Sequence, residues 1–206
     1  MLERQFERQA WRSDVTDLSE FIGRAAEDGC RGIVSYGVAG GLCPDLRSGD
    51  IVIGSEVVGS NGSIPTDDIW SAWLLSALPT AVYGPIAGVD IAVSAAMSRS
   101  ELRLRSSALA ADMESHFIAG LAAANALRFV ALRVIVDAAG RNVPPTALAC
   151  VSSDGETSRW QLSRLLLGRP TDMLDVIKLS ADWWRARKAL LHCSGALGSS
   201  VGAIEL

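Results

Sequence analysis

The stretch Ala111–Gly140, "ADMESHFIAGLAAANALRFVALRVIVDAAG", decides the fold. Its first half sets alanines and leucines at helical spacing behind two acids and a methionine, which predicts a helix from about Met113 to Ala126. Its second half, Arg128–Val136, is a continuous apolar run rich in valine and isoleucine, typical of a buried strand, and the run stops at Asp137. A helix feeding a buried strand is the repeating unit of an α/β fold.

The same pattern extends over the rest of the chain. Helices are expected at 17–29, 69–78, 98–105, 157–167 and 171–191, and further strands at 32–36, 51–58, 80–84, 89–94 and 108–112, with a polar loop at 59–68. We therefore expect an α/β fold of three layers, α/β/α, around a mixed, mostly parallel sheet. Residues 1–206 are expected to form one domain.

Composition excludes several classes of protein. The chain has 206 residues, 49% of them hydrophobic and 20% charged, as a folded domain requires. A net charge of −4 offers no electrostatic basis for binding nucleic acid. Two arginine-rich groups are interpreted as solvated helix faces; they are Arg99, Arg103 and Arg105, and Arg185, Arg187 and Lys188.

Cysteine and histidine are too few and too widely spaced for a zinc cluster or a disulfide framework, since the chain has four cysteines and two histidines. We therefore expect reduced thiols in a cytoplasmic protein, without metal or cofactor. The amino terminus lacks the apolar core of a signal peptide, and the most apolar window is too interrupted to span a bilayer.

Two carboxylates are candidates for chemistry. Glu114 shares a helical stripe with Ile118 and Leu121, which would face it inward, where vicinal sugar hydroxyls could bind both of its oxygens. The alternative is a first-turn acid that the helix dipole stabilises. Asp137 ends a buried strand, at the edge where ligands of open α/β sheets bind, and could act as a general acid. The alternative is an aspartate that caps a turn before Gly140.

The glycine segment Gly37–Leu42, "GVAGGL", is expected to be a turn whose bare backbone can approach a flat or anionic group. It matches neither the dinucleotide-binding nor the P-loop pattern. A tight chain reversal without a ligand would explain it equally well.

Four motifs in this order, "GVAGGL", "SGDIVI", "ADMES" and "RVIVDAAG", resemble those of the purine nucleoside phosphorylase/nucleosidase superfamily. They are most similar to the methylthioadenosine/S-adenosylhomocysteine nucleosidase branch. Together with the tail "RNVPPTAL…DGETS…LLLGRPTDML", they resemble the hopanoid-associated phosphorylases, or adenosylhopane nucleosidases. The resemblance extends from about Gly32 to Leu191.

The resemblance implies an enzyme that cleaves the N-glycosidic bond of an adenine nucleoside. By similarity, Asp137 protonates the purine at N7 and Glu114 holds the ribose hydroxyls. Met113 packs on the sugar, and the backbone of Ala39 and Gly40 lines the base and the sugar. The implied partners are an adenine nucleoside, with a hydrophobic 5′ tail if it is adenosylhopane, a second copy in a homodimer, and weak peripheral contact with a membrane.

Three departures from the family's pattern bear on the mechanism. Ser35 and Val38 stand where phosphorolytic relatives carry an arginine and a serine or threonine that grip phosphate, which favours water as the nucleophile. Val136 stands where relatives place a serine or threonine beside the catalytic aspartate. The segment "MLERQFERQAWRS" shows no strand pattern, so the first strand, with its water-activating glutamate, is expected to be lacking.

Three functions remain open at this stage. The first is a nucleosidase for adenosylhopane, in which Trp70, Trp73, Leu74 and Leu75 either line an apolar channel or form ordinary core. The second is a methylthioadenosine/S-adenosylhomocysteine nucleosidase or a nucleoside phosphorylase. The third is an inactive nucleoside-binding protein.

Overall fold

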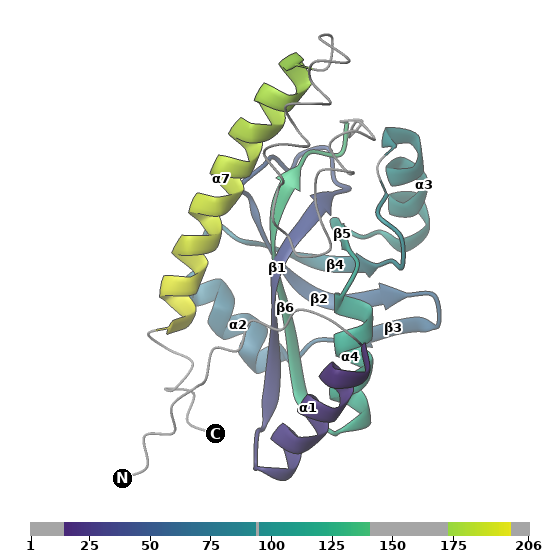
Figure 1. Ribbon diagram of the computed structural model, residues 1–206, viewed down its shortest axis with the longest axis vertical. Helices are drawn as coiled ribbons and strands as arrows, with labels where there is room; N and C mark the ends of the chain where they lie inside the picture. Colours follow the sequence, from purple (N-terminus) through teal and green to yellow (C-terminus); the bar gives the residue numbers. More distant parts are fainter. Residues whose placement is uncertain (1–14, 94, 141–172, 199–206) are drawn as a thin grey trace.

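The computed structural model describes residues 15–93, 95–140 and 173–198. Its strands are β1 (Gly32–Gly41), β2 (Ile51–Gly59), β3 (Gly62–Pro65), β4 (Val82–Gly88), β5 (Ala110–Asp112) and β6 (Arg128–Asp137). Its helices are α1 (Val15–Glu27), α2 (Asp68–Ala77), α3 (Ala96–Ser106), α4 (Ser115–Ala124) and α7 (Met173–Gly198). Figure 1 shows them around a twisted central sheet.

The sheet is mixed and runs in the order β3-β2-β4-β5-β1-β6, with a further pairing between β2 and β6. That pairing closes the five strands β2, β4, β5, β1 and β6 into a ring. The pairs β1–β6, β2–β4 and β4–β5 are parallel, whereas β1–β5, β2–β3 and β2–β6 are antiparallel. The predicted α/β class with a mixed central sheet is confirmed.

Strand β6 shows how the sequence divides the core into two halves. Successive strand residues point to opposite faces. Val130, Leu132 and Val134 pack with α2 and α7. Phe129 and Ile135 pack with α4 on the other face. The two helix pairs lie on opposite sides of β1 and β6 in Figure 1 (α2 and α7 on the left, α1 and α4 on the right).

The four apolar residues of α2 that could line a channel or form ordinary core belong to the core. Leu74 is fully buried, and Trp70, Trp73 and Leu75 pack partly buried against the core on the α7 side. They therefore contribute to the layer that joins α2 to α7.

Three predicted elements differ from the structure. The glycine segment is not a turn, because β1 continues through Gly41, pairing with β6 and, at its end, with β5. The predicted loop at 59–68 contains β3, which forms a hairpin with β2 around Gly62 at φ +118. The strand predicted at 89–94 does not form over 89–93, the part of this segment that the structure describes, and the pairing of β4 with β5 ends at Gly88 and Asp112.

The remaining predicted elements agree with the structure within a few residues at each end, except that α7 continues to Gly198. Three earlier expectations fall outside the described residues: the helix at 157–167, the absence of a first strand before residue 15, and Cys150. Among the helices described, none has both the length and the apolar run that crossing a bilayer requires.

Candidate functional site

Asp137 lies at the carboxyl end of β6, and a β-bulge sets its position. Ala39 pairs with Ile135, but the next residue of β1, Gly40, pairs with Asp137, so Val136 is the extra residue. Bulges of this kind re-aim a side chain and occur often beside active sites. Asp137 is 5% exposed, and its Oδ1 would lie 3.3 Å from a Cβ at Gly40. A side chain at Gly40 would therefore press on the carboxyl group and require it to shift by a few tenths of an ångström.

Arg99 of α3 holds Asp137 in an ion pair between two side chains that are both almost fully buried. Its guanidinium also donates to the carbonyl oxygens of Val93 at 2.8 Å and of Ala138 at 3.2 Å. The prediction that Arg99 belongs to a solvated helix face is therefore wrong, because burial of Asp137 requires a nearby cation. Arg105 and the group on α7 are exposed, as predicted.

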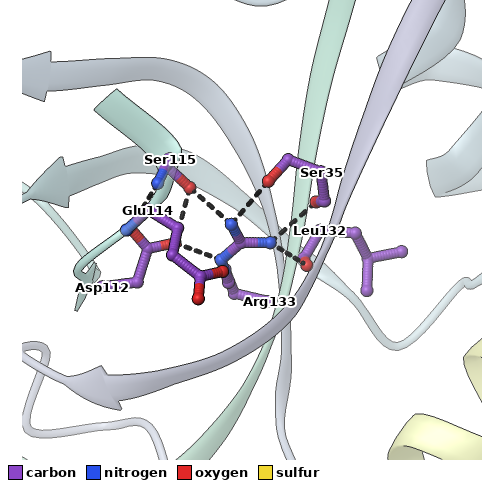
Figure 2. Close-up of polar contacts among 6 residues, drawn as sticks. All are labelled: Ser35, Asp112, Glu114, Ser115, Leu132 and Arg133. Carbon is purple, nitrogen blue, oxygen red and sulfur yellow. Dashed lines mark hydrogen bonds and ion pairs between the residues drawn. The ribbon is translucent and has the colours of Figure 1, made fainter. Parts of the chain in front are cut away.

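A second buried arginine organises the start of the "ADMES" segment. Figure 2 shows the Arg133 guanidinium between Ser35 on one side and Asp112 and Ser115 on the other. Arg133 pairs with Asp112, and it donates to the Ser35 hydroxyl at 2.7 Å, the Ser35 carbonyl at 2.7 Å and the Ser115 hydroxyl at 2.8 Å. Arg133 is 1% exposed and Asp112 is 8% exposed. The network joins β1, β5, β6 and α4.

Asp112 also determines where α4 begins. Its carboxylate accepts hydrogen bonds from the backbone N–H of Ser115 at 2.9 Å and from the Ser115 hydroxyl at 2.5 Å. The helix therefore starts at Ser115, and Glu114 is its N-cap residue with an exposed side chain. The prediction that Glu114 lies on an inward helical stripe is wrong for this reason. Met113 is also exposed, at 52%.

The register of the sheet brings the two predicted motifs to one edge. Gly40 pairs with Asp137 on one side and with Ala111 on the other. Neighbouring strands are about 4.7–4.9 Å apart, so Ala111 and Asp137 lie roughly 10 Å from each other across Gly40. Met113 and Glu114 follow Ala111 directly. The general-acid candidate and the sugar-binding candidates thus emerge from β6 and β5, the two strands that flank β1 at Gly40.

Two other predicted contacts can reach this edge only through their backbone. Ala39 is 3% exposed, and its side chain packs in the core on the α4 side. Val136 packs against the core on the α7 side. Of Ala39, Gly40 and Val136, only Gly40 has no side chain that covers the sheet surface at this edge.

The His116 imidazole lies 3.1 Å from the Asp90 carboxylate, outside the network of Figure 2, and only 24% of the His116 side chain is exposed. Within the residues described, no group of three or more His, Cys, Asp and Glu gathers as a metal site would require. The charges at this edge therefore come mainly from two buried arginines and their aspartates.

Sequence reasoning missed Arg99, Asp112, Ser115 and Arg133. A signal existed for Arg133, since a lone arginine inside an apolar strand requires an anionic partner. No comparable signal existed for Arg99, because its partner is 38 residues away in the chain.

Comparisons with known proteins agree with this architecture. Solved structures with the same fold include a futalosine hydrolase mutant from Helicobacter pylori, at 20% identity and a TM-score of 0.53, covering 59% of this chain and 64% of that one. A methylthioadenosine/S-adenosylhomocysteine nucleosidase from Colwellia psychrerythraea in complex with adenine has 22% identity and a TM-score of 0.57, covering 74% and 73%. The Streptococcus pneumoniae enzyme with 8-aminoadenine has 18% identity and a TM-score of 0.57, covering 72% and 74%.

The chain thus spans slightly less than two thirds of the length of the futalosine hydrolase mutant. A search of curated proteins finds no match. The family model described as the phosphorylase superfamily matches residues 18–164, which include the six strands described and the site edge. The chain belongs to the phosphorylase superfamily.

Proposed function

We propose that the chain is an N-ribosyl hydrolase that releases adenine from a 5′-substituted adenosine. The observation that carries the proposal is the convergence of Asp137 and the "ADMES" segment on either side of Gly40. Support comes from the superfamily match and from structural neighbours that include nucleosidases with adenine or 8-aminoadenine bound.

In the proposed reaction, Asp137 donates a proton to N7 of the purine while the bond between C1′ and N9 breaks. A water molecule then forms the new bond to C1′ and loses one proton to the solvent, from which Asp137 is protonated again, so the products are adenine and the free sugar. Protonation makes the base a better leaving group, and the carboxylate of Glu114 stabilises the positive charge that develops on the ribose. Met113 covers the sugar, and the backbone at Ala39, Gly40 and Val136 lies beside the base and the sugar.

The ion pair with Arg99 adds a requirement to this mechanism. A guanidinium beside a carboxylate favours the ionised form of the acid. To act as the general acid, Asp137 must carry a proton when the bond between C1′ and N9 breaks. Arg99 orients the carboxyl group until then through its contacts with Val93 and Ala138.

Water is proposed as the nucleophile instead of phosphate. The Ser35 hydroxyl already accepts a hydrogen bond from Arg133, and Val38 carries no polar group with which to bind an anion. We expect release of adenine to proceed without phosphate. Formation of ribose 1-phosphate on addition of phosphate would instead identify a phosphorylase.

Adenosylhopane is the proposed substrate, on the strength of the motif resemblance. Methylthioadenosine and S-adenosylhomocysteine are the alternatives, favoured by the names of the structural neighbours. Purified protein incubated with each nucleoside, with free adenine followed by chromatography, separates the three: the preferred substrate is the one with the highest kcat/KM. We also propose that the chain forms a homodimer. Light scattering after size-exclusion chromatography measures the mass of the particle directly.

A further inference from the structure

The outer face of α7 carries a set of side chains that the proposed reaction does not use. Trp183 is 51% exposed, Trp184 is 67% exposed and Leu191 is 58% exposed. Arg187 and Lys188 are also exposed. Residues three and four apart are neighbours on a helix, so these five side chains form one stripe. We call it the α7 outer face.

The opposite side of α7 is fixed to the protein. Ala186 and Cys193 are fully buried in the core cluster on that side. The Ser48 hydroxyl donates to the carbonyl of Asp182 at 2.6 Å, and the Tyr36 hydroxyl donates to the carbonyl of Leu190. In Figure 1, α7 is the outermost described element on its side of the sheet. The α7 outer face is therefore presented to the surroundings on a rigid support.

The charges of this face select an anionic partner. Between residues 181 and 198, the cations are Arg185, Arg187 and Lys188, while the single acid, Asp182, is 4% exposed and accepts a hydrogen bond from Arg185 at 2.8 Å. This cationic strip belongs to a chain whose net charge is −4. In a two-fold dimer through this face, the cationic strips of both copies would lie in one interface without exposed acids from the described part of α7 between 181 and 198, so a second copy of the chain is disfavoured.

The aromatic groups select a partner with an apolar interior. Tryptophan indoles concentrate at the boundary between lipid headgroups and acyl chains, and cations beside them attract anionic lipids. The Arg187 guanidinium lies over the ring of Trp184, 5.7 Å from its centroid, in a cation–π interaction that holds the charge beside the indole. Leu191 has no counterpart on a nucleic acid, whose accessible surface is mainly phosphate and sugar.

We propose that the α7 outer face binds the surface of an anionic lipid bilayer. The two tryptophans and Leu191 enter the interface, while Arg187 and Lys188 contact the headgroups. The proposal goes beyond the proposed reaction, because membrane binding through α7 requires no nucleoside.

The test is co-sedimentation of the full chain with vesicles of phosphatidylcholine alone or mixed with phosphatidylglycerol. We expect binding to the mixed vesicles that weakens at high salt. In Arg187→Gln/Lys188→Gln the partition coefficient falls about tenfold or more, since each cation near the surface contributes about fivefold. Trp183→Ala/Trp184→Ala also lowers it about tenfold, through lost apolar burial.

Leu104→Ala/Arg105→Gln is the matched control, because it removes an apolar residue that is 84% exposed and an exposed cation from α3. It should bind as the wild type does, and circular dichroism should show the same fold in all variants. Equal binding to both vesicle types, or equal binding by all variants, overturns the proposal. The proposal is also overturned if the wild type is a dimer and Trp183→Ala/Trp184→Ala is a monomer, which would make this face a dimer interface. It is likewise overturned if the chain binds a single-stranded oligonucleotide and not the vesicles. None of these readouts depends on adenine release.

Discussion

Replacing Arg133 by methionine removes the centre of the buried network while keeping an unbranched apolar stem in its place. The carboxylate of Asp112 then loses its cation, and the Ser35 and Ser115 hydroxyls each lose a donor. Asp112 keeps its hydrogen bonds from Ser115, which anchor the first turn of α4.

The expected loss is large compared with the stability of a typical domain. Removing one partner of a buried ion pair costs about 3–5 kcal/mol, because the other charge stays in the interior. Native domains are stable by only about 5–15 kcal/mol. We therefore expect Arg133→Met to fold only at low temperature, with the free energy of unfolding lowered by about 3–5 kcal/mol.

Urea denaturation of four proteins measures this coupling: the wild type, Arg133→Met, Asp112→Asn and the double variant. Because the double variant leaves neither charge without its partner, the coupling energy should be about 2 kcal/mol or more, within the range seen for residues in contact. Arg105→Met is the control, since it removes an exposed arginine and should change stability by at most about 0.5 kcal/mol. A loss below about 1 kcal/mol for Arg133→Met, or strictly additive single changes, would refute the reasoning.

Two further predictions concern Gly40 and the two buried groups Tyr36 and Cys193 beside α7. In Gly40→Ala, the new Cβ lies 3.3 Å from Asp137 Oδ1 and 3.7 Å from Arg99 Nη2, so kcat should fall about tenfold or more with a smaller change in KM. The control Gly120→Ala meets nothing within 4 Å in α4 and should raise stability by about 0.4–1 kcal/mol; equal kcat in both variants would contradict the assignment. Burial, and then nearby Cys193, raise the pKa of Tyr36 from 10.0 to about 12, and burial raises the pKa of Cys193 from 9.0 to about 11. Since the unfolded chain loses these protons first, stability should be complete below about pH 9 and fall as the pH rises towards 11–12; urea denaturation against pH measures this, and Tyr36→Phe should fall less steeply than the wild type.

The sequence predicted the elements whose signal is local and continuous. The run Arg128–Val136 identified β6, and the pattern of apolar residues identified α2 to within one residue at each end. Because the carboxyl ends of strands collect ligands, Asp137 could be selected as a candidate acid without knowledge of its neighbours. The sheet register then placed "ADMES" beside it.

The missed features depend on contacts between distant parts of the chain. Glu114 follows the periodicity of α4 but lies outside the helix, because the carboxylate of Asp112 captures the first N–H groups. Arg99 lies in a helix with charges on several sides, so no periodicity distinguishes it from Arg105. Its burial follows from the position of Asp137, which only the folded sheet defines.

The most direct test of the proposed reaction compares adenine release by the wild type and by Asp137→Asn, with thermal unfolding of both measured in parallel. The account predicts that the wild type releases adenine from a 5′-substituted adenosine in the absence of phosphate. It also predicts that the variant loses about 100-fold or more in kcat, because asparagine cannot donate the proton that a general acid supplies. Adenine release by a folded Asp137→Asn variant at the wild-type rate, or no release by the wild type from any of the three nucleosides, would contradict it.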